Sequence, residues 1–385
     1  MKIIVVGLGE AGRALVRILD NGNHDIVVID EKREAVETVT DMFRVNGVVG
    51  SGASSQTLKK AGAETADVLV ALTHTDEINL LSCMQAKSAG TKLCAARLLM
   101  PDLVGEEAEL KKQYKIDYFV KPRMDLAEEV YRNIGLPGYV KLESYMDERI
   151  YVLDLNAVGS SPLIGRSVAA IRTEVNADMR IGIVIRGKRA MQPKDDLVIK
   201  ENDTLYIVVR KEELDKAFRA LGIKRDRVRD VVIVGGRISG GYLTQKLLAA
   251  GKKVTMIVDD VNRARIEMER FPAANVIYAE GDITDVLEEE RVEKADAIVS
   301  LTDNDETNLV TSMYAWSKKI PSVITRVDKQ IHVRLLHKVN IDITVSPTEI
   351  SVFRIIRFIS EAMHENMDEE TMITEFLRIT KLMRN

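Results

Sequence analysis

One long pattern occurs twice in this sequence, and its two copies lie 229 residues apart (295 − 66 and 308 − 79). Residues 66–73 read ADVLVALT and residues 295–302 read ADAIVSLT, and an asparagine follows each octapeptide at the same interval, Asn79 and Asn308. Each copy also opens with an apolar run that ends in glycine, Gly7 and Gly235. Solenoid repeats have units of only ~20–50 residues, so a period of this length indicates a duplicated domain.

The size and charge of the chain limit its architecture and its partners. A domain holds roughly 100–200 residues, so 385 residues predict about two to four domains. The 55 basic and 59 acidic residues are interspersed, and the formal net charge is −4. Because no stripe of basic residues is present to neutralise phosphates, we expect no DNA or RNA partner.

Cysteine, histidine and hydropathy patterns argue against several other classes. Cys83 and Cys94 are too few for a disulfide framework and form no Cys-x-x-Cys pair, which fits a reducing cytosol. The five histidines are scattered without metal-ligand spacing, and no Ser/His/Asp or Cys/His arrangement suggests a catalytic nucleophile. No run approaches the ~18 consecutive apolar residues of a membrane-spanning helix. We therefore expect no metal site, no catalytic residues and, at most, action from one side of a membrane.

Strand-like and helical runs alternate in both copies. The expected strands of the first copy are 3–6, 26–29, 45–49, 68–72, 93–97 and 118–120, and those of the second are 231–234, 255–258, 276–278, 297–301, 322–326 and 343–345. Several of them are apolar without polar alternation, which indicates a parallel sheet covered on both faces by helices. The predicted fold class is therefore α/β, with duplicated doubly wound, Rossmann-like sheets.

The segment between the copies has a different pattern. Short β-type runs at 150–155, 181–186, 197–199 and 204–209, with helices at 164–172 and 211–221, predict a small α+β module. We expect a first nucleotide-binding domain at 1–137, the small module at 138–222, a linker at 223–228, a second nucleotide-binding domain at 229–360 and a tail at 361–385. Each nucleotide-binding domain should close with a helix after a proline, Pro122 or Pro347.

The first copy carries the glycine pattern of dinucleotide-binding domains. Gly7, Gly9 and Gly12 fit Gly-x-Gly-x-x-Gly directly after a strand and at the start of a helix. In this motif the first glycine makes the tight turn, the second lets a pyrophosphate approach the backbone, and the third allows close packing of helix and strand. The diphosphate would lie at the helix N-terminus, and Asp30 would bind a ribose hydroxyl. Asp30 would repel a 2′-phosphate, so unphosphorylated adenosine ligands are favoured over NADP.

The second copy departs from this pattern at its middle glycine. Gly235 and Gly240 keep the first and third positions, but Arg237 stands where the second glycine should be. A side chain there narrows the approach of a phosphate, although a guanidinium can also pair with phosphate oxygens. Asp259 is expected to preserve the ribose-binding carboxylate. A weakened or altered second site is therefore the favoured interpretation.

Polar residues at the carboxyl ends of other strands are further candidates, because open α/β sheets bind ligands at this edge. Thr73 and Thr302 end the fourth strands, with helix N-capping by these threonines or by the aspartates that follow as an equally weighted alternative. Arg97 and Arg326 could reach a phosphate or an interface, or could form surface salt bridges. The complete set of candidate nucleotide-binding residues is Gly7, Leu8, Gly9, Glu10, Ala11, Gly12, Asp30, Ser51, Gly52, Thr73, His74, Arg97, Gly235, Gly236, Arg237, Ile238, Ser239, Asp259, Asp282, Thr302 and Arg326.

The helix expected after Pro347 has an apolar stripe. Ile350, Phe353, Ile356 and Ile359 recur at helical spacing, which more often marks a core or an interface than a ligand site. An oligomer contact is a plausible use of this stripe.

With these motifs in place, the chain resembles the TrkA-like regulatory subunits of potassium uptake systems, the RCK or KTN domain family. The resemblance covers nearly the whole length and rests on residues 7–12 with Asp30, residues 50–54, residues 66–79 and their counterparts in the second copy. The middle module also resembles the small C-terminal regulatory domain of this family. It has Asn202 where the family usually has glycine, and the sequence ends before the second small module that two-domain relatives commonly carry.

The resemblance implies a regulatory protein and not an enzyme. It implies a cytoplasmic subunit, peripheral on the inner face of the cell membrane, that binds NAD or NADH and possibly ATP or ADP and gates a TrkH-like potassium-translocating membrane protein. It also implies a homo-oligomer, a dimer or a tetrameric ring. The alternatives are an NAD-dependent oxidoreductase, which would need a substrate lobe with a placed acid, base or metal, and a nucleotide-sensing scaffold without a channel.

Overall fold

The structure is a computed structural model. It describes residues 1–385 except 21, 23, 146–147, 160, 176, 188, 280–282, 330–331, 334, 337–342 and 364–385. Most of the expected tail at 361–385 therefore lies outside the described residues. The chain divides into two compact units, one formed by Met1–Asp125 with the segment that begins at Pro347, and the other by Leu126–Ser346.

The first copy forms a six-stranded parallel sheet with the strand order β3-β2-β1-β4-β5-β6. Its strands are β1 (Lys2–Val6), β2 (Asp25–Asp30), β3 (Asn46–Val49), β4 (Val68–Ala71), β5 (Leu93–Arg97) and β6 (Tyr118–Val120). The helices along this part of the chain are α1 (Glu10–Leu19), α2 (Arg33–Met42), α3 (Ser55–Lys60), α4 (Asp76–Ala89), α5 (Pro101–Gly105), α6 (Glu107–Tyr114) and α7 (Pro122–Asn133).

Two apolar cores, one on each face, hold this sheet in place. Ile3 and Val5 of β1 pack into one core cluster, while Ile4 and Val6 pack into the other, because successive side chains of a strand point to opposite faces. Burial on both faces explains why the sequence of β1 is apolar without alternation. The predicted doubly wound sheet is confirmed.

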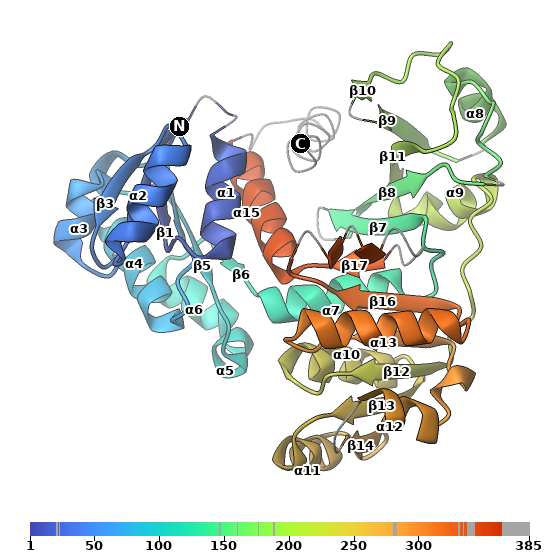
Figure 1. Ribbon diagram of the computed structural model, residues 1–385. Coiled ribbons are helices and arrows are strands. Elements are labelled where there is room, and N and C mark those ends of the chain that lie inside the picture. Colours follow the sequence, from blue (N-terminus) through green and yellow to red (C-terminus); the bar gives the residue numbers. More distant parts are fainter. Residues whose placement is uncertain are drawn as a thin grey trace. The chain divides into compact units, whose positions relative to one another are not determined.

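The second copy repeats the architecture with the order β14-β13-β12-β15-β16-β17, in which all the pairs are parallel (Figure 1). Its strands are β12 (Asp230–Val234), β13 (Lys253–Val258), β14 (Asn275–Tyr278), β15 (Ala297–Ser300), β16 (Ser322–Arg326) and β17 (Ile343–Val345). Its helices are α10 (Ile238–Ala249), α11 (Val261–Arg270), α12 (Ile283–Glu289) and α13 (Asp305–Ser317), and α15 (Pro347–Met363) follows the last strand.

The middle module is a five-stranded antiparallel sheet with the order β10-β9-β11-β8-β7. Its elements are β7 (Val140–Tyr145), β8 (Ile150–Asn156), α8 (Val168–Glu174), β9 (Met179–Arg186), β10 (Arg189–Met191), β11 (Asp203–Arg210) and α9 (Leu214–Ala220). The predicted α+β class is confirmed. The expected strand at 197–199 is only an isolated bridge between Val198 and Ser167, and β7 is a strand that the sequence pattern did not predict.

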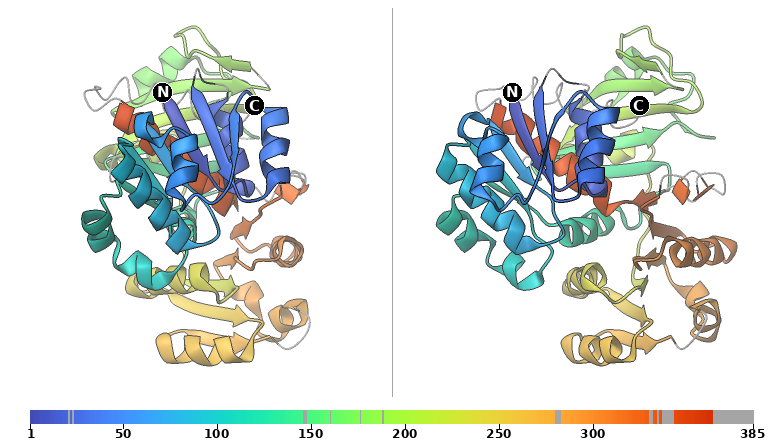
Figure 2. Two further views of the ribbon diagram at one scale, coloured as in Figure 1. Left: turned by 90° about the vertical axis from the view of Figure 1, so that its left-hand side faces the viewer. Right: turned by 60° about the vertical axis from the view of Figure 1, so that its left-hand side comes forward.

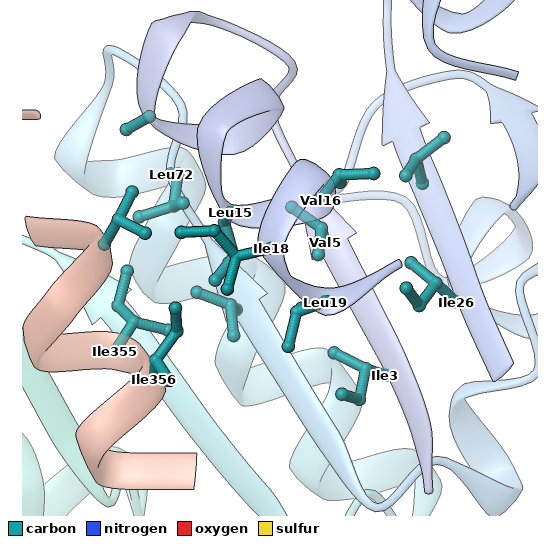
Figure 3. Close-up of a cluster of buried hydrophobic side chains, with 14 of the residues drawn as sticks. Ile3, Val5, Leu15, Val16, Ile18, Leu19, Ile26, Leu72, Ile355 and Ile356 are labelled. Carbon is teal, nitrogen blue, oxygen red and sulfur yellow. The ribbon is translucent and has the colours of Figure 1, made fainter. Parts of the chain in front are cut away.

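Helix α15 follows the second sheet in the sequence but packs on the first copy. It lies alongside α1 in each view (Figure 2). Ile355 and Ile356 of α15 share one apolar cluster with Leu15 and Ile18 of α1, as Figure 3 shows. The apolar stripe of α15 is therefore core of the first unit, and the oligomer contact suggested for it from the sequence is wrong.

Polar and aromatic contacts fasten α15 to the first unit as well. Arg354 pairs with Asp125 at 3.2 Å, and Phe358 stacks on Tyr118 with 5.0 Å between the ring centroids. Burial raises the pKa of Asp125, even though Arg354 and the Lys121 amide favour its ionised form.

Helix α7, the counterpart of α15 in the first copy, contacts the second copy. Glu128 of α7 pairs with Lys246 of α10 at 2.6 Å, and the same ammonium lies 5.0 Å from the centre of the Tyr131 ring. Each copy's closing helix thus lies against the other copy's first helix. The prolines Pro122 and Pro347 begin these helices, as predicted.

Candidate functional site

The first and third glycines of the first copy are required by the fold itself. Gly7 has φ +91°, and a Cβ on it would lie 2.8 Å from the amide nitrogen of Thr73. A Cβ on Gly12 would lie 2.0 Å from the carbonyl oxygen of Gly7, closer than any such atoms approach. These two positions make the turn between β1 and α1 and its packing against β4, and they would be glycine with or without a ligand.

Gly9 is different, because nothing in the part of the chain that the structure describes requires a glycine there. Its φ of −67° suits any residue, and a Cβ on it would meet only Nε2 of His74, at an ordinary contact distance of 3.5 Å. Arg237 occupies the equivalent position of the second copy with almost the same backbone, φ −76° and ψ −169° against −67° and −167°. Side-chain space is therefore left open at Gly9 beside the first turn of α1.

The N-terminus of α1 faces this open space. Gly9 is the N-cap residue, and it has no side chain with which to cap the helix. The first amides of a helix carry no internal partner, and the helix dipole adds partial positive charge there, so this end suits an anion such as a diphosphate. Leu8 and Ala11, also named as candidates, are buried beneath the turn, and Glu10 is exposed.

Asp30 ties the end of β2 to the glycine turn. Its Oδ2 accepts a hydrogen bond from the amide of Leu8 at 2.7 Å, and its Oδ1 accepts one from the amide of Lys32 at 2.9 Å. Each carboxylate oxygen has more than one acceptor position, so capacity for sugar hydroxyls remains. The loop after β3 returns to the same place, because the Gly50 amide donates to the Asp30 carbonyl, and Ser51 and Gly52 follow directly.

At the end of β4, Thr73 is held by a buried asparagine. The side-chain oxygen of Asn79 accepts from the Thr73 amide at 2.8 Å and from its hydroxyl at 2.7 Å. The amide group of Asn79 donates to the carbonyls of Thr73 and Arg97, so it joins the ends of β4 and β5. The N-capping role considered for Thr73 is wrong, because Thr75 is the N-cap residue of α4.

Arg97 and His74 lie at the same edge. The guanidinium of Arg97 donates to the Thr73 carbonyl through Nε at 3.2 Å and Nη2 at 2.5 Å, and no carboxylate of the described residues lies within ion-pair distance of it. Burial lowers the pKa of Arg97, with Asp76 opposing that effect. His74 is exposed and directs Nε2 toward Gly9. The structure thus brings Asp30 and His74 to the glycine turn at the N-terminus of α1, and Arg97 is tied to the carbonyl of Thr73, the residue before His74.

In the second copy the turn keeps its backbone but not its surroundings. Gly235 has φ +110°, and a Cβ on Gly240 would lie 2.1 Å from the Gly235 carbonyl oxygen, as in the first copy. Gly236 and Ser239 are buried, Ile238 is partly buried, and Arg237 is exposed. Asn308 holds Thr302 at 2.7 Å as Asn79 holds Thr73, and the N-cap residue of α13 is Asn304.

The expected equivalence of Asp30 and Asp259 is corrected by the strand register. Val6 lies opposite Ile29, and Val234 lies opposite Ile257, so Val258 is the counterpart of Asp30. One residue is inserted between the second and third strands of the second copy, which changes the offset between copies from 228 to 229. Val258 is buried, whereas Asp259, the next residue in the chain, is exposed to solvent.

Arg326 is held by carboxylates, in contrast to Arg97. It forms a short ion pair with Asp303 and a second with Asp328 at 3.0 Å, so the salt-bridge alternative holds for Arg326. Asp303 also pairs with Arg237 at 3.3 Å. Asp303 was not among the sequence candidates, although its position after Thr302, where the first copy has His74, was a usable signal. Asp282 lies outside the described residues.

Elsewhere, one departure from the family pattern is accommodated by the backbone. Asn202 has φ +66°, so asparagine makes the left-handed turn usually made by glycine. The next residue, Asp203, is fully buried and accepts two hydrogen bonds from the guanidinium of Arg186, at 2.8 and 2.7 Å. This pair is structural and fixes the turn before β11.

In the described part of the chain, no group of three or more His, Cys, Asp or Glu side chains is arranged to hold a metal ion. Among these residues, no helix combines the length and apolar character that crossing a membrane requires.

The fold and the glycine turns define a class, that of proteins with two Rossmann-type nucleotide domains joined by a small α+β module. The TrkA-N domain family matches residues 3–122 and again residues 231–347, and the TrkA-C domain family matches residues 157–222. The chain belongs to the TrkA family, which carries these RCK domains.

Curated relatives cover most of the chain. The Trk system potassium uptake protein TrkA of Vibrio alginolyticus is 26% identical over 366 residues, which are 94% of this chain and 80% of the relative. A TrkA homolog of Archaeoglobus fulgidus is 28% identical, covering 96% of this chain and 83% of its own. TrkA homolog 1 of Methanosarcina mazei is 30% identical, covering 93% and 89%. These relatives are potassium uptake proteins and not enzymes, so the oxidoreductase alternative falls.

Solved structures share the fold. The GsuK channel bound to NAD has a TM-score of 0.68 at 18% identity, covering 94% of this chain. GsuK bound to ADP has a TM-score of 0.58 at 14% identity. This chain spans 64% of the length of the NAD-bound channel protein, less than two thirds.

Proposed function

We propose that this protein is a nucleotide-sensing regulatory subunit of a potassium uptake system. In this proposal the first copy binds NAD, NADH, ATP or ADP at the cytoplasmic face of the membrane. The bound nucleotide changes how the subunit gates a TrkH-like potassium-translocating partner. The potassium uptake role follows from family membership, and the binding residues are proposed from the geometry of the first copy.

The space left open at Gly9 is the observation that supports nucleotide binding. A glycine that neither the backbone nor the packing requires is a position kept free for a ligand. The diphosphate would accept hydrogen bonds from the first amides of α1, and Asp30 would accept them from a ribose. Arg97 and His74 would add donors at the outer side of the diphosphate, while Ser51 and Gly52 would face the adenine.

Regulation requires that the ligands distinguish two arrangements of the protein. A nucleotide shifts an equilibrium only by its difference in affinity for the two states, and such couplings are typically ~1–3 kcal/mol. We propose that NADH and ATP favour different arrangements and that the partner responds to the shift. Titrations in which both ligands bound every conformation equally well would refute this mechanism.

A homo-oligomer is part of the proposal, and α13 offers a surface for it. Val310, Met313 and Trp316 are spaced at three-residue intervals and are each about half exposed, at 48, 49 and 49%. Leu81, the counterpart of Val310, is also exposed on α4. An exposed apolar stripe of this kind marks an interaction surface on a protein. Sedimentation of the full chain as a monomer at micromolar concentration would contradict this part.

The decisive experiment compares Gly9→Arg with Gly9→Ala by calorimetric titration with NADH, NAD, ATP and ADP. Gly9→Arg places a long side chain in the diphosphate path and should weaken binding about 100-fold or more, which corresponds to about 2.7 kcal/mol. Gly9→Ala should weaken it much less. Both variants should keep the wild-type melting temperature, because the protein has room for a Cβ at this position.

Two results would overturn the proposal. Unchanged affinity in Gly9→Arg would show that the diphosphate does not lie at α1. Absence of binding by the wild-type chain would remove the nucleotide-sensing role altogether. A separate flux measurement with a reconstituted TrkH-like partner, with and without this subunit and each nucleotide, tests the gating step.

A further inference from the structure

The second copy supplies a carboxylate of its own at the place where the first copy leaves space. Asp303 lies between two guanidinium groups, pairing with Arg237 at 3.3 Å and with Arg326 through a shorter contact. Arg237 is the N-cap residue of α10, so Asp303 stands beside the helix end that would otherwise face an anion. The corresponding residues of the first copy are Gly9, His74 and Arg97, which contain no carboxylate.

The formal charge around the two helix ends is the same, but its arrangement differs. In the first copy the corresponding positions hold Gly9, Asp30, His74, Arg97 and Leu99, one negative and one positive charge when histidine is counted as neutral. In the second copy they hold Arg237, Val258, Asp303, Arg326 and Asp328, two positive and two negative charges that also sum to zero. A diphosphate entering the second copy would approach two carboxylates, and both arginines already have ion-pair partners.

In the second copy a side chain also fills the place that corresponds to the proposed ribose-binding position at Asp30. Val258 replaces Asp30, and a Cβ on Gly236 would lie 1.9 Å from its Cγ1, so this valine fills the space beneath the turn. The residue pair Leu8 and Asp30 of the first copy has thus become Gly236 and Val258. No carboxylate is left at this position to accept hydrogen bonds from a ribose.

Helix α11 also differs from α2 beside the turn. Arg263 donates through Nε to the Gly236 carbonyl at 2.8 Å and pairs with the fully buried Glu267 at 2.6 Å. The first copy has Ala35 and Val39 at these positions of α2. Ala35 of the first copy therefore corresponds to Arg263 of the second copy, whose side chain is hydrogen-bonded to the glycine turn.

We propose that Asp303 takes the place of a ligand diphosphate in the second copy, so that the chain binds one dinucleotide, in the first copy only. Arg237, Val258 and Asp303 are the residues that set this difference. The inference rests on the proposed nucleotide site of the first copy. The consequence is that the two copies are not equivalent: the first copy responds to nucleotide, and the second copy does not.

The test counts and locates bound ligand in the full chain, with ADP and NADH as probes. Calorimetry of the wild type should give one site per chain, and Gly9→Arg should weaken binding at this site about 100-fold or more. In a Gly9→Arg background, the combined change Arg237→Gly, Val258→Asp and Asp303→His installs the first-copy residues in the second copy. This protein should regain one site, with affinity at least about tenfold above that of Gly9→Arg alone, a difference of about 1.4 kcal/mol.

Photolabelling of the wild type with 8-azido-ADP provides a measurement that needs no substitution. Labelled peptides should come from the first copy, near residues 50–54, and not from the second. Two sites per chain, or labelling in the second copy, would overturn the inference. So would a grafted protein that keeps its melting temperature and fails to bind. If the wild-type chain binds no nucleotide, the proposed function is refuted. Even then, binding by the variant that carries Arg237→Gly, Val258→Asp and Asp303→His would support the role of these three residues in the second copy.

Discussion

The two TrkA-N domains of this chain have the same fold but differ at the carboxyl edge of the sheet. Both have the strand order 3-2-1-4-5-6 within their copy, the same left-handed first glycine and the same buried asparagine between the fourth and fifth strands. They differ at the second glycine, at the end of the second strand and after the fourth strand. The comparison separates residues that build the domain from residues that we propose to face a ligand.

The largest effect is expected where both copies share a structural requirement. Gly7→Ala forces alanine into φ +91° with its Cβ 2.8 Å from the Thr73 nitrogen, and Gly235→Ala meets the Leu301 carbonyl carbon at the same distance with φ +110°. Each should destabilise its domain by about 3 kcal/mol, because strain and a backbone clash add. Denaturant unfolding of the full chain measures the loss.

Gly251→Ala is the matched control for these two variants. Gly251 also has a positive φ, +70°, but no atom of the described residues lies within 4 Å of its Cβ position, so only about 1 kcal/mol of backbone strain is expected. Equal losses at Gly7, Gly235 and Gly251 would contradict the role given to close packing. A large loss at Gly7 with none at Gly235 would break the structural equivalence of the copies.

A loss of stability of intermediate size is expected on substitution of Asp305, the first residue of α13 in the second copy. Asp305 is buried and accepts hydrogen bonds from the amides of Asp328 and Lys329 and from His332 Nδ1, at 3.0, 3.0 and 2.9 Å. Burial opposes its ionisation, but these partners outweigh it and hold the pKa of Asp305 below its ordinary value. Asp305→Asn should cost about 2 kcal/mol at pH 7.

The pH dependence follows from the direction of that shift. Because the pKa of Asp305 is lower in the folded protein, its contribution to stability is complete above the unfolded value of about 3.9 and is lost as the pH falls through the folded value. Stabilities of wild type and Asp305→Asn should therefore converge below about pH 4. A constant difference down to pH 2 would contradict this assignment. Asp76→Asn tests the same tie in the first copy, where the amides of Leu99 and Met100 are the donors.

The smallest effect is expected at the second glycine position, where the copies differ most in sequence. Arg237→Ala removes a side chain that is 74% exposed and one ion pair, and such surface pairs contribute about 0–1 kcal/mol. The melting temperature should change by only a few degrees. A loss comparable to that of Gly235→Ala would show that Arg237 supports the turn, and the comparison between ligand-facing and structural residues would then fail.

Much of the fold could be predicted from local patterns. Twelve apolar runs, the glycine turns and the prolines predicted both parallel sheets, because each signal depends on neighbours close in the chain. Prediction failed where long-range packing decides. The apolar stripe of α15 shows that a helix is buried but not against which domain, and it lies on α1 of the first copy. The assignment of Asp259 failed because the offset of 229 residues applies only from the third strand onward, whereas the second strands and the helices after them are 228 residues apart.

The duplication, the two sheets, the glycine turns and membership of the family are all encoded in the order of the residues, since backbone geometry and hydrophobic periodicity act over a few positions. Only the tertiary structure showed that neither the backbone nor the packing requires a glycine at position 9. It also determined where α7 and α15 pack, and that Asp303 forms ion pairs with Arg237 and Arg326. Those outcomes depend on distances between residues tens of positions apart. Electrostatic and steric contacts at such separations arise only after the chain has folded.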